Sequence, residues 1–371
     1  MTDIIKLLQL AKSKSASDLH MVVSKPPLFR IYGNLVPADD LAELTSEDID
    51  QALDQITTEK EKADFNSNLE LDFGRTIPDA GRMRFNAAKQ RGTTSLVIRL
   101  LPPEIPDPET LGLPKVCKEL ITRPRGLVVV SGPTGSGKTT TLASMINYLN
   151  QTENRRVITI EDPIEYTYNH IKCTITQREL GHDTLSFAEA LRHVLRQDPD
   201  VILVGEMRDL ETASAALTVA ETGHLVLTTG HAPSAAQAVE RIANMFPPHE
   251  RHLAQERLAS LLLGILCQAL VPKASGSGRV AAIEVMLANP AVRNLIREGK
   301  TYQLPNTIRM NTQQGMELLD QALVRLYRNG MISRESVFEF CNDPEEITKL
   351  TDKSETRSQN EQNMAYTTQF K

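Results

Sequence analysis

Residues 132–139 form a glycine-rich segment that constrains the fold more than any other feature of this 371-residue chain. The segment reads GPTGSGKT and matches the pattern G-x-x-x-x-G-K-[ST] at every fixed position. An apolar run, LVVVS, precedes it, and helix-forming residues follow it. Glycines let several backbone N–H groups converge on one anion, and the start of a helix adds positive partial charge. The pattern therefore predicts a strand, a phosphate-binding loop and a helix.

The same pattern assigns roles to individual residues. Lys138 is expected to reach the β- and γ-phosphates of ATP, and the hydroxyl of Thr139 is expected to bind Mg²⁺. The loop carries no information about the base, so a preference for ATP over GTP stays open. The residues expected to contact the nucleotide are Gly132, Pro133, Thr134, Gly135, Ser136, Gly137, Lys138, Thr139 and Thr140.

Three further segments supply polar groups at the ends of expected strands. Glu206 follows the apolar run VILV and Gly205, where a carboxylate can orient water or help to hold the metal. The segment ITIEDPIE contains Glu161, Asp162 and Glu165, which read equally well as carboxylates near Mg²⁺ or as an acidic turn that caps a helix. His231 follows HLVLTT and could contact the γ-phosphate, although an isolated histidine there is more often a hydrogen-bonded core residue.

The pattern of apolar residues divides the chain into parts. Residues 1–101 read as a mixed α/β domain, with one helix over residues 45–65 that starts at a Thr45–Asp48 capping box. Residues 102–114 are proline-rich and are expected to be a linker. Residues 115–350 alternate apolar strands with helices, which predicts a mainly parallel sheet covered on both faces. Residues 351–371 are polar and are expected to be disordered.

Composition excludes some classes of protein. The longest apolar run, residues 258–270, is too short to span a bilayer and is expected to be a buried helix. Four scattered cysteines without a C-x-x-C pair do not indicate a zinc site, and they fit a reducing cytoplasm. A net charge of −6 and 4% aromatic residues disfavour a DNA motor or helicase, which needs a basic groove and stacking rings.

Four segments in this order resemble the secretion ATPase superfamily of type II secretion and type IV pili. They read GPTGSGKTT, ITIEDPIE, VILVGEMRD and TGHLVLTTGHA, and the likeness covers the chain to about residue 350. Residues 291–298, AVRNLIRE, are similar to the hallmark helix of its pilus retraction subgroup. On physical grounds alone this segment is an amphipathic helix with Arg293, Arg297 and Glu298 exposed. Assembly and secretion members usually carry four clustered cysteines, which this chain lacks.

The resemblance implies a fold and an activity. The fold would be a PAS-like α/β N-terminal domain and a RecA-like ATPase domain with a helical C-terminal subdomain. The protein would be a hexameric motor that hydrolyses ATP to retract type IV pili and drive twitching motility. It would lie in the cytoplasm against the inner membrane, act on a membrane platform protein and only indirectly on pilin, and need neither nucleic acid nor membrane insertion.

The resemblance also implies that arginines of the N-terminal domain reach the phosphates. Arg84 and Arg99 are the best candidates by position, with Arg82 close behind, although surface arginines on strands would look the same. A planar guanidinium suits the charge that develops on the γ-phosphoryl oxygens. One departure concerns the histidine segment, where Gly230 replaces the usual leucine. We expect this glycine to loosen the backbone next to His231.

Three alternatives remain at this point. A pilus assembly or type II secretion ATPase would share the catalysis and reverse the mechanical output. A P-loop DNA motor is disfavoured by net acidity, and a regulatory module without turnover is disfavoured by Glu206 and Glu161. The sequence leaves open which retraction paralogue this is, the symmetry of a ring and its order of firing.

Overall fold

The computed structural model describes residues 3–31, 33–38, 40–101 and 104–351, and these residues form two compact units. The first unit is Met1–Ile105 together with Asp162–Tyr168, and the second is Pro106–Glu161 together with Asn169–Lys371. The sequence predicts one boundary between domains, at residues 102–114, and does not predict that Asp162–Tyr168 joins the first unit. Thr351 is helical and buried, and the expected disorder of residues 352–371 lies outside the described residues.

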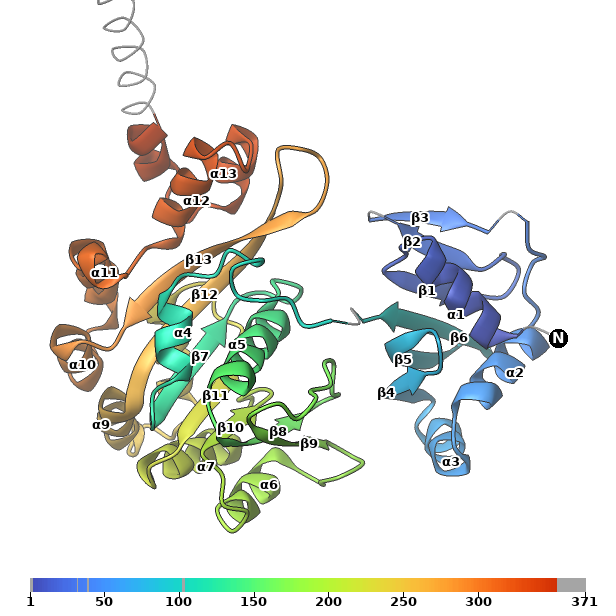
Figure 1. The fold of residues 1–371 in the computed structure, drawn as a ribbon, viewed down its shortest axis with the longest axis horizontal. Coiled ribbons are helices and arrows are strands. Elements are labelled where there is room, and N and C mark those ends of the chain that lie inside the picture. Colours follow the sequence, from blue (N-terminus) through green and yellow to red (C-terminus); the bar gives the residue numbers. More distant parts are fainter. Residues whose placement is uncertain (1–2, 32, 39, 102–103, 352–371) are drawn as a thin grey trace, which may run out of the picture. The chain divides into compact units, whose positions relative to one another are not determined.

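The first unit is a six-stranded antiparallel sheet in the order β3-β2-β1-β6-β5-β4, as Figure 1 shows. Apolar side chains from one face of the sheet and from three helices form a single core. This agrees with the expected α/β N-terminal domain. The elements are α1 (Ile4–Ser13), β1 (Asp18–Met21), β2 (Leu28–Ile31), β3 (Asn34–Pro37), α2 (Ser46–Ile56), α3 (Glu59–Asn68), β4 (Glu70–Ile77), β5 (Gly81–Gln90) and β6 (Thr93–Leu100).

The single helix expected over residues 45–65 is wrong, because the structure has two helices there, α2 and α3. Thr45 caps α2 through Asp48 as expected, and Thr58 caps α3 through Glu61 in a second capping box. The backbone at Thr57 and Thr58 is extended, which interrupts the helix. A second capping box within the run is the local signal for a new helix start.

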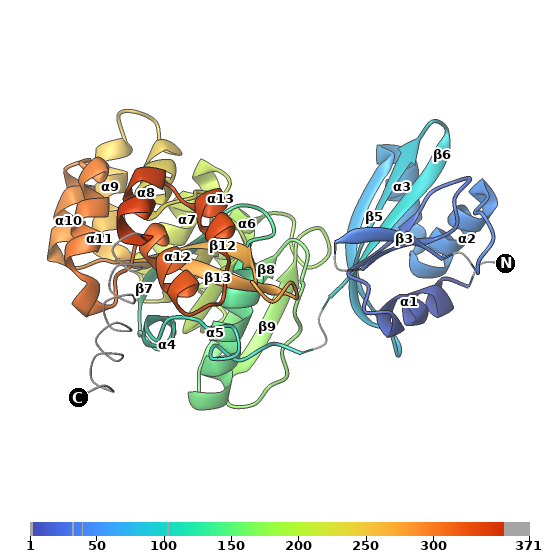
Figure 2. The same ribbon diagram turned by 90° about the horizontal axis from the view of Figure 1, so that it is seen from above.

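The second unit has a seven-stranded sheet in the order β13-β12-β7-β11-β10-β8-β9. Every neighbouring pair is parallel except β12 and β13, so the expected mainly parallel sheet is confirmed. Helices α6 to α11 cover one face and α4 and α5 cover the other (Figures 1 and 2). The elements up to β11 are α4 (Val116–Ile121), β7 (Gly126–Ser131), α5 (Lys138–Thr152), β8 (Arg156–Glu161), β9 (Thr174–Glu179), α6 (Phe187–Val194), β10 (Val201–Val204), α7 (Leu210–Glu221) and β11 (Leu225–Thr229).

The expectation of a buried helix over residues 258–270 is wrong for most of that segment. Helix α9 (Arg251–Leu261) ends early, and Leu262–Pro272 forms strand β12 between β7 and β13 (Arg279–Leu287). A strand in this position is buried on both faces, so its sequence is apolar throughout and periodicity cannot distinguish it from a buried helix.

The described part of the second unit closes with a group of helices, of which α12 packs against β13 and α13 against β12. They follow α8 (Ala235–Asn244), α9 and the hairpin β12–β13, and comprise α10 (Pro290–Arg297), α11 (Leu304–Met310), α12 (Leu319–Arg328) and α13 (Arg334–Phe340), with short 3₁₀ turns at Thr301–Gln303 and Thr312–Gln314. Among the described residues, none of the helices combines the length and the apolar character that crossing a membrane requires.

The AVRNLIRE segment forms α10, and one expectation about it is wrong. Arg297 and Glu298 are exposed, but Arg293 is half-buried. Its guanidinium donates hydrogen bonds to the carbonyl oxygens of Ala288, Ser260 and Leu262, at 2.7–2.8 Å. A cation that binds carbonyls at the end of α9 also meets the negative end of the helix dipole. Arg293 therefore holds α10 onto α9 and is not a free surface charge.

Candidate nucleotide-binding site

The loop between β7 and α5 requires glycine at its first position. Gly132 has a φ of +143°, and a Cβ atom there would lie 2.3 Å from the carbonyl oxygen of Gln268. Gly135 and Gly137 also have positive φ, at +77° and +88°. Successive turns of this kind point backbone N–H groups inward, which makes a cradle for an anion.

The start of α5 faces this cradle. Its N-cap is Gly137, which offers no side chain to bond the first N–H groups of the helix. Lys138 is buried, and its ammonium donates to the carbonyl oxygens of Gly132 and Pro133 at 2.9 and 3.0 Å. The buried hydroxyl of Ser136 has no hydrogen-bond partner among the described residues. An uncapped helix start, a lysine and a buried hydroxyl without a partner suit a phosphate group.

The other residues of the loop differ in their exposure. Pro133, Thr134 and Gly135 form the exposed tip, and Thr139 and Thr140 are half-buried in the first turn of α5. Among the described residues, no group of three or more His, Cys, Asp or Glu side chains is arranged to hold a metal ion. The Thr139 hydroxyl is the kind of oxygen ligand that Mg²⁺ accepts beside nucleotide phosphates.

Sequence reasoning missed Gln268, which supports the loop from β12. Its buried side chain donates to the carbonyl oxygen of Ser136 and accepts a bond from the Thr141 hydroxyl at 2.8 Å. The signal was a single amide within the apolar run GILCQAL. The sequence predicts a helix for this run and therefore does not place the amide beside the P-loop.

The topology brings the other polar candidates to one edge of the sheet. Strands β7, β11, β10 and β8 are parallel neighbours, so their carboxyl ends lie together. The P-loop follows β7, His231 follows β11, Glu206 follows β10, and Glu161 is the last residue of β8. Ligands in open α/β sheets bind at this edge.

Glu206 and His231 are in direct contact. His231 Nε2 lies 3.0 Å from Glu206 Oε1, and Arg208 Nε donates to Glu206 Oε2 at 2.8 Å. The Glu206 side chain is 16% exposed, so it is sheltered but reachable from solvent. Sequence reasoning had not paired the two residues and had not identified Arg208. A carboxylate held on both sides by cationic or ionisable groups has a fixed direction, which a water-orienting residue needs.

Glu161 is buried and is held by its own neighbours. Its carboxylate accepts bonds from the Thr159 hydroxyl at 2.6 Å and from the Gln177 amide at 3.2 Å. Asp162 and Glu165 belong to the first unit, so the structure does not collect the three acidic residues in one unit. Glu161 is thus the member of this segment that stays with the P-loop sheet.

The candidate arginines lie together on the sheet of the first unit. Arg84 and Arg99 are direct partners across β5 and β6. Arg84 Nε donates to Asp72 at 3.1 Å, and this bond raises the pKa of the arginine. Arg99 Nε donates to Asp18 at 2.9 Å. Arg82 Nε donates to the carbonyl oxygen of Ile164 at 3.0 Å. Each guanidinium is therefore oriented by a partner within its own unit.

Close packing explains why position 230 is a glycine. A Cβ atom at this position would lie 3.2 Å from Ser131 Oγ, which leaves little room for a side chain. The N–H of Gly230 donates to the carbonyl oxygen of Val130 at 3.0 Å. The backbone before His231 is thus bonded to β7, whereas the sequence suggested a loosened segment.

Comparison with known proteins agrees with this geometry. A family model described as "Type II/IV secretion system protein" matches residues 4–369. The chain is 45% identical over 343 residues to the type IV pilus retraction ATPase PilT of Pseudomonas aeruginosa, covering 92% of this chain and 99% of that one. It is 41% identical to a twitching motility protein of Neisseria gonorrhoeae, covering 90% and 89%.

A solved structure has the same fold. The crystal structure of the pilus retraction motor PilT with bound ADP matches with a TM-score of 0.87 at 44% identity, and the match covers 94% of this chain and all of that one. Both the family model and the match to PilT of Pseudomonas aeruginosa extend over nearly the whole chain. The chain belongs to the type II/IV secretion system protein family.

Proposed function

We propose that this chain hydrolyses ATP as a ring of six subunits and that the ring powers type IV pilus retraction and twitching motility. The observation that carries the proposal is the contact between Glu206 and His231 at the sheet edge that also bears the P-loop. A module that only binds nucleotide has no need of an oriented carboxylate at that position. The long matches to retraction ATPases support the mechanical output.

The residues of the site take separate roles. The N–H groups at the start of α5 bind the phosphates, and Lys138 leaves the carbonyls of Gly132 and Pro133 to contact the β- and γ-phosphates. The Thr139 hydroxyl would hold Mg²⁺, which when bound would neutralise charge on the phosphate oxygens. Glu206 orients the attacking water, and Glu161 supports the same edge.

His231 and the arginines respond to charge on the γ-phosphate. His231 can contact either Glu206 or a γ-phosphate oxygen, so loss of the phosphate changes its partner. Arg84 and Arg99, with Arg82 as a third candidate, neutralise charge as the phosphoryl group leaves. In other P-loop enzymes such an arginine contributes a factor of about 10³ to 10⁵ in rate. In the structure Arg84 and Arg99 each donate to a carboxylate, Asp72 and Asp18, which orients the guanidinium.

The output of hydrolysis is mechanical. The ring is expected at the cytoplasmic face of the inner membrane, where it acts on a platform protein so that pilin subunits leave the base of the fibre. Nothing in this role requires contact with nucleic acid or insertion into the membrane. All four cysteines are free, and Cys117, Cys173 and Cys267 are buried. Pilus assembly motors usually carry a zinc site of four clustered cysteines, so the scattered cysteines of this chain favour a retraction motor.

Phosphate release by the purified full chain in Mg²⁺ and ATP, together with its assembly mass, tests the proposal. Wild type should release phosphate as a hexamer, and Lys138→Ala should not release phosphate. Deleting the gene should leave excess pili that do not retract. Loss of pili would instead indicate an assembly motor, and binding to DNA that weakens with salt would indicate a DNA motor. A chain that binds ATP without turnover would be a regulatory module.

A further inference from the structure

One buried carboxylate joins two helices of the second unit. Glu284 lies on β13 and is 3% exposed. Its Oε1 accepts a hydrogen bond from the N–H of Ala235 at 2.7 Å, and its Oε2 accepts one from the N–H of Leu319 at 3.3 Å. Ala235 is the first residue of α8, and Leu319 is the first residue of α12. Each oxygen therefore meets the positive end of a different helix.

A carboxylate is a costly way to fill this position. Burial raises the pKa of Glu284, and the bonds from Ala235 and Leu319 act in the opposite direction. The charge of the Asp320 carboxylate also raises the pKa of Glu284. A buried charge gives up its hydration, which hydrogen bonds from the protein must replace. Glu284 holds the first residues of α8 and α12 next to the same side chain.

The loop that carries His231 has a second anchor at the P-loop strand. Ser131 is fully buried, and its hydroxyl donates to the carbonyl oxygen of Ala232 at 2.7 Å and accepts from its N–H at 2.8 Å. Ser131 immediately precedes Gly132. The residues from His231 to Ala235 are thus held near one end by β7 and at the other end by Glu284.

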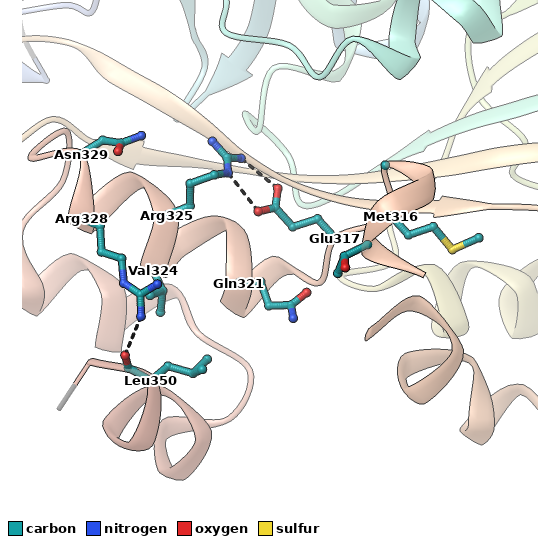
Figure 3. A pocket seen from close by; sticks show the side chains of 10 residues that line it. Met316, Glu317, Gln321, Val324, Arg325, Arg328, Asn329 and Leu350 are labelled. Carbon is teal, nitrogen blue, oxygen red and sulfur yellow. Dashed lines mark hydrogen bonds and ion pairs between the residues drawn. The ribbon is translucent and has the colours of Figure 1, made fainter. Parts of the chain in front are cut away.

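The start of α12 is equally well fixed to β13. The backbone of Glu317 pairs with that of Val285 through hydrogen bonds of 2.7 and 3.1 Å. The Glu317 carboxylate accepts two bonds of 2.9 Å from Arg325, and a cavity of about 540 Å³ opens beside these residues (Figure 3). The His231 loop and the start of α12 are thus connected through the two hydrogen bonds that Glu284 accepts.

We propose that Glu284 is a positioning residue, which holds the His231 loop in place for hydrolysis and ties it to the start of α12. This inference rests on the proposed function, because it gives His231 a role in turnover. Both helix starts share one carboxylate, so rotation of that group changes both bonds. The C-terminal helices follow the state of the nucleotide site through this connection.

The first test is Glu284→Gln in the full-length protein. The amide has the same size, but its NH₂ group faces one of the two N–H donors, so one bond is lost. We expect kcat for ATP to fall by about tenfold, which corresponds to one buried donor left unpaired. The KM for ATP should stay near the wild-type value, because the P-loop contacts are unchanged.

Asp320→Asn is the matched control. Asp320 is also a buried carboxylate, and it accepts bonds from the N–H groups of Asn342 and Asp343 at 2.8 and 2.9 Å. These bonds do not reach the His231 loop. The charge of Asp320 raises the pKa of Glu284, so its removal leaves Glu284 more readily ionised and able to accept both of its hydrogen bonds. The melting temperature should fall by a similar amount in both variants, but Asp320→Asn should keep the wild-type kcat. Equal losses of kcat in both variants would assign the effect to stability and overturn the proposal.

Amide hydrogen exchange supplies a readout that does not need turnover. In Glu284→Gln, exchange should rise together in peptides that cover residues 231–236 and 316–322, whereas in Asp320→Asn residues 231–236 should be unaffected. Wild-type kcat in Glu284→Gln, or a rise in only one of the two peptides, would refute the link. Failure of the wild type to release phosphate would instead refute the proposed function, and the exchange experiment would still decide on Glu284.

Discussion

His231 Nε2 lies 3.0 Å from Oε1 of Glu206, and this contact joins the ends of strands β11 and β10. The two residues are 25 positions apart in the sequence, and parallel pairing of their strands brings them together. Arg208 holds the other oxygen of the same carboxylate. The carboxylate thus has a defined orientation before any nucleotide contacts it.

Glu206→Gln should bind ATP as wild type does and lose turnover. The amide keeps the shape of the side chain but cannot accept a proton or orient water through a charge, so kcat should fall by about 10² to 10⁴. Phosphate release and nucleotide binding measured on the same preparation separate the two effects. Glu211→Gln, on the exposed side of α7, is the control and should keep full activity. Normal turnover in Glu206→Gln would remove this residue from catalysis.

Gln268→Ala should weaken nucleotide binding more than it slows hydrolysis. The substitution removes the donor to Ser136 and the acceptor for Thr141, and leaves buried polar groups unpaired beside the P-loop. One such group costs about 1–3 kcal/mol, so KM for ATP should rise by about tenfold or more. Steady-state kinetics measure this, with Gln51→Ala on the surface of α2 as control. A lower kcat at unchanged KM would contradict a supporting role.

Arg293→Ala and Arg297→Ala should behave differently, although both change α10. Arg293 donates to several carbonyl oxygens, so its loss should lower stability by about 2–3 kcal/mol, while the folded fraction keeps its ATPase rate. Arg297 is exposed, so its loss should leave both stability and hydrolysis unchanged. Thermal melting and phosphate release measure these effects.

The surface of α10 is tested by pilus retraction in cells. If Arg297 contacts a partner, cells that carry Arg297→Ala should retract their pili poorly, although the purified variant has a normal ATPase rate. Normal retraction in that variant would restrict α10 to a structural role, which Ile296, fully buried in the core, already has.

Glu61 should make the first unit sensitive to acid. Burial acts to raise its pKa, but bonds from Thr58 and the charge of Arg75 together hold the pKa below its ordinary value of 4.5. A lowered pKa in the folded state means that the stabilisation is present above about pH 4.5 and is lost as pH falls through the folded pKa. At pH 7 the wild type should therefore have a higher melting temperature than Glu61→Gln, and this difference should shrink as the pH falls. Melting from pH 3.5 to 8 measures it, and Glu59→Gln, which is exposed, should show no such trend.

Local pattern was sufficient where one segment determines its own structure. The P-loop, the alternating strands and helices after it, and the positions of Glu206 and His231 at strand ends all follow from short runs of residues. Their contact could not be predicted, because it depends on which strands are neighbours. The order β7-β11-β10-β8 is a property of the whole sheet.

The wrong predictions have physical causes of the same kind. Strand β12 is apolar on both faces because β7 and β13 enclose it, and only the amide of Gln268 distinguished it from a helix. Arg293 looked exposed because amphipathicity describes one helix alone, whereas its partners are carbonyl oxygens at the end of α9 and just before α10. Gly230 looked flexible because the sequence does not reveal the proximity of Ser131.

The segment Asp162–Tyr168 has a consequence for how this protein can be dissected. It belongs to the first unit, but the residues on either side of it belong to the second, so the backbone passes between units at residues 105–106, 161–162 and 168–169. A protein shortened to end at Ile105 would deprive Arg82 of the Ile164 carbonyl. No single cut leaves both units whole. A complete fragment of the first unit would need the short segment supplied as a separate peptide or fused to it through a linker.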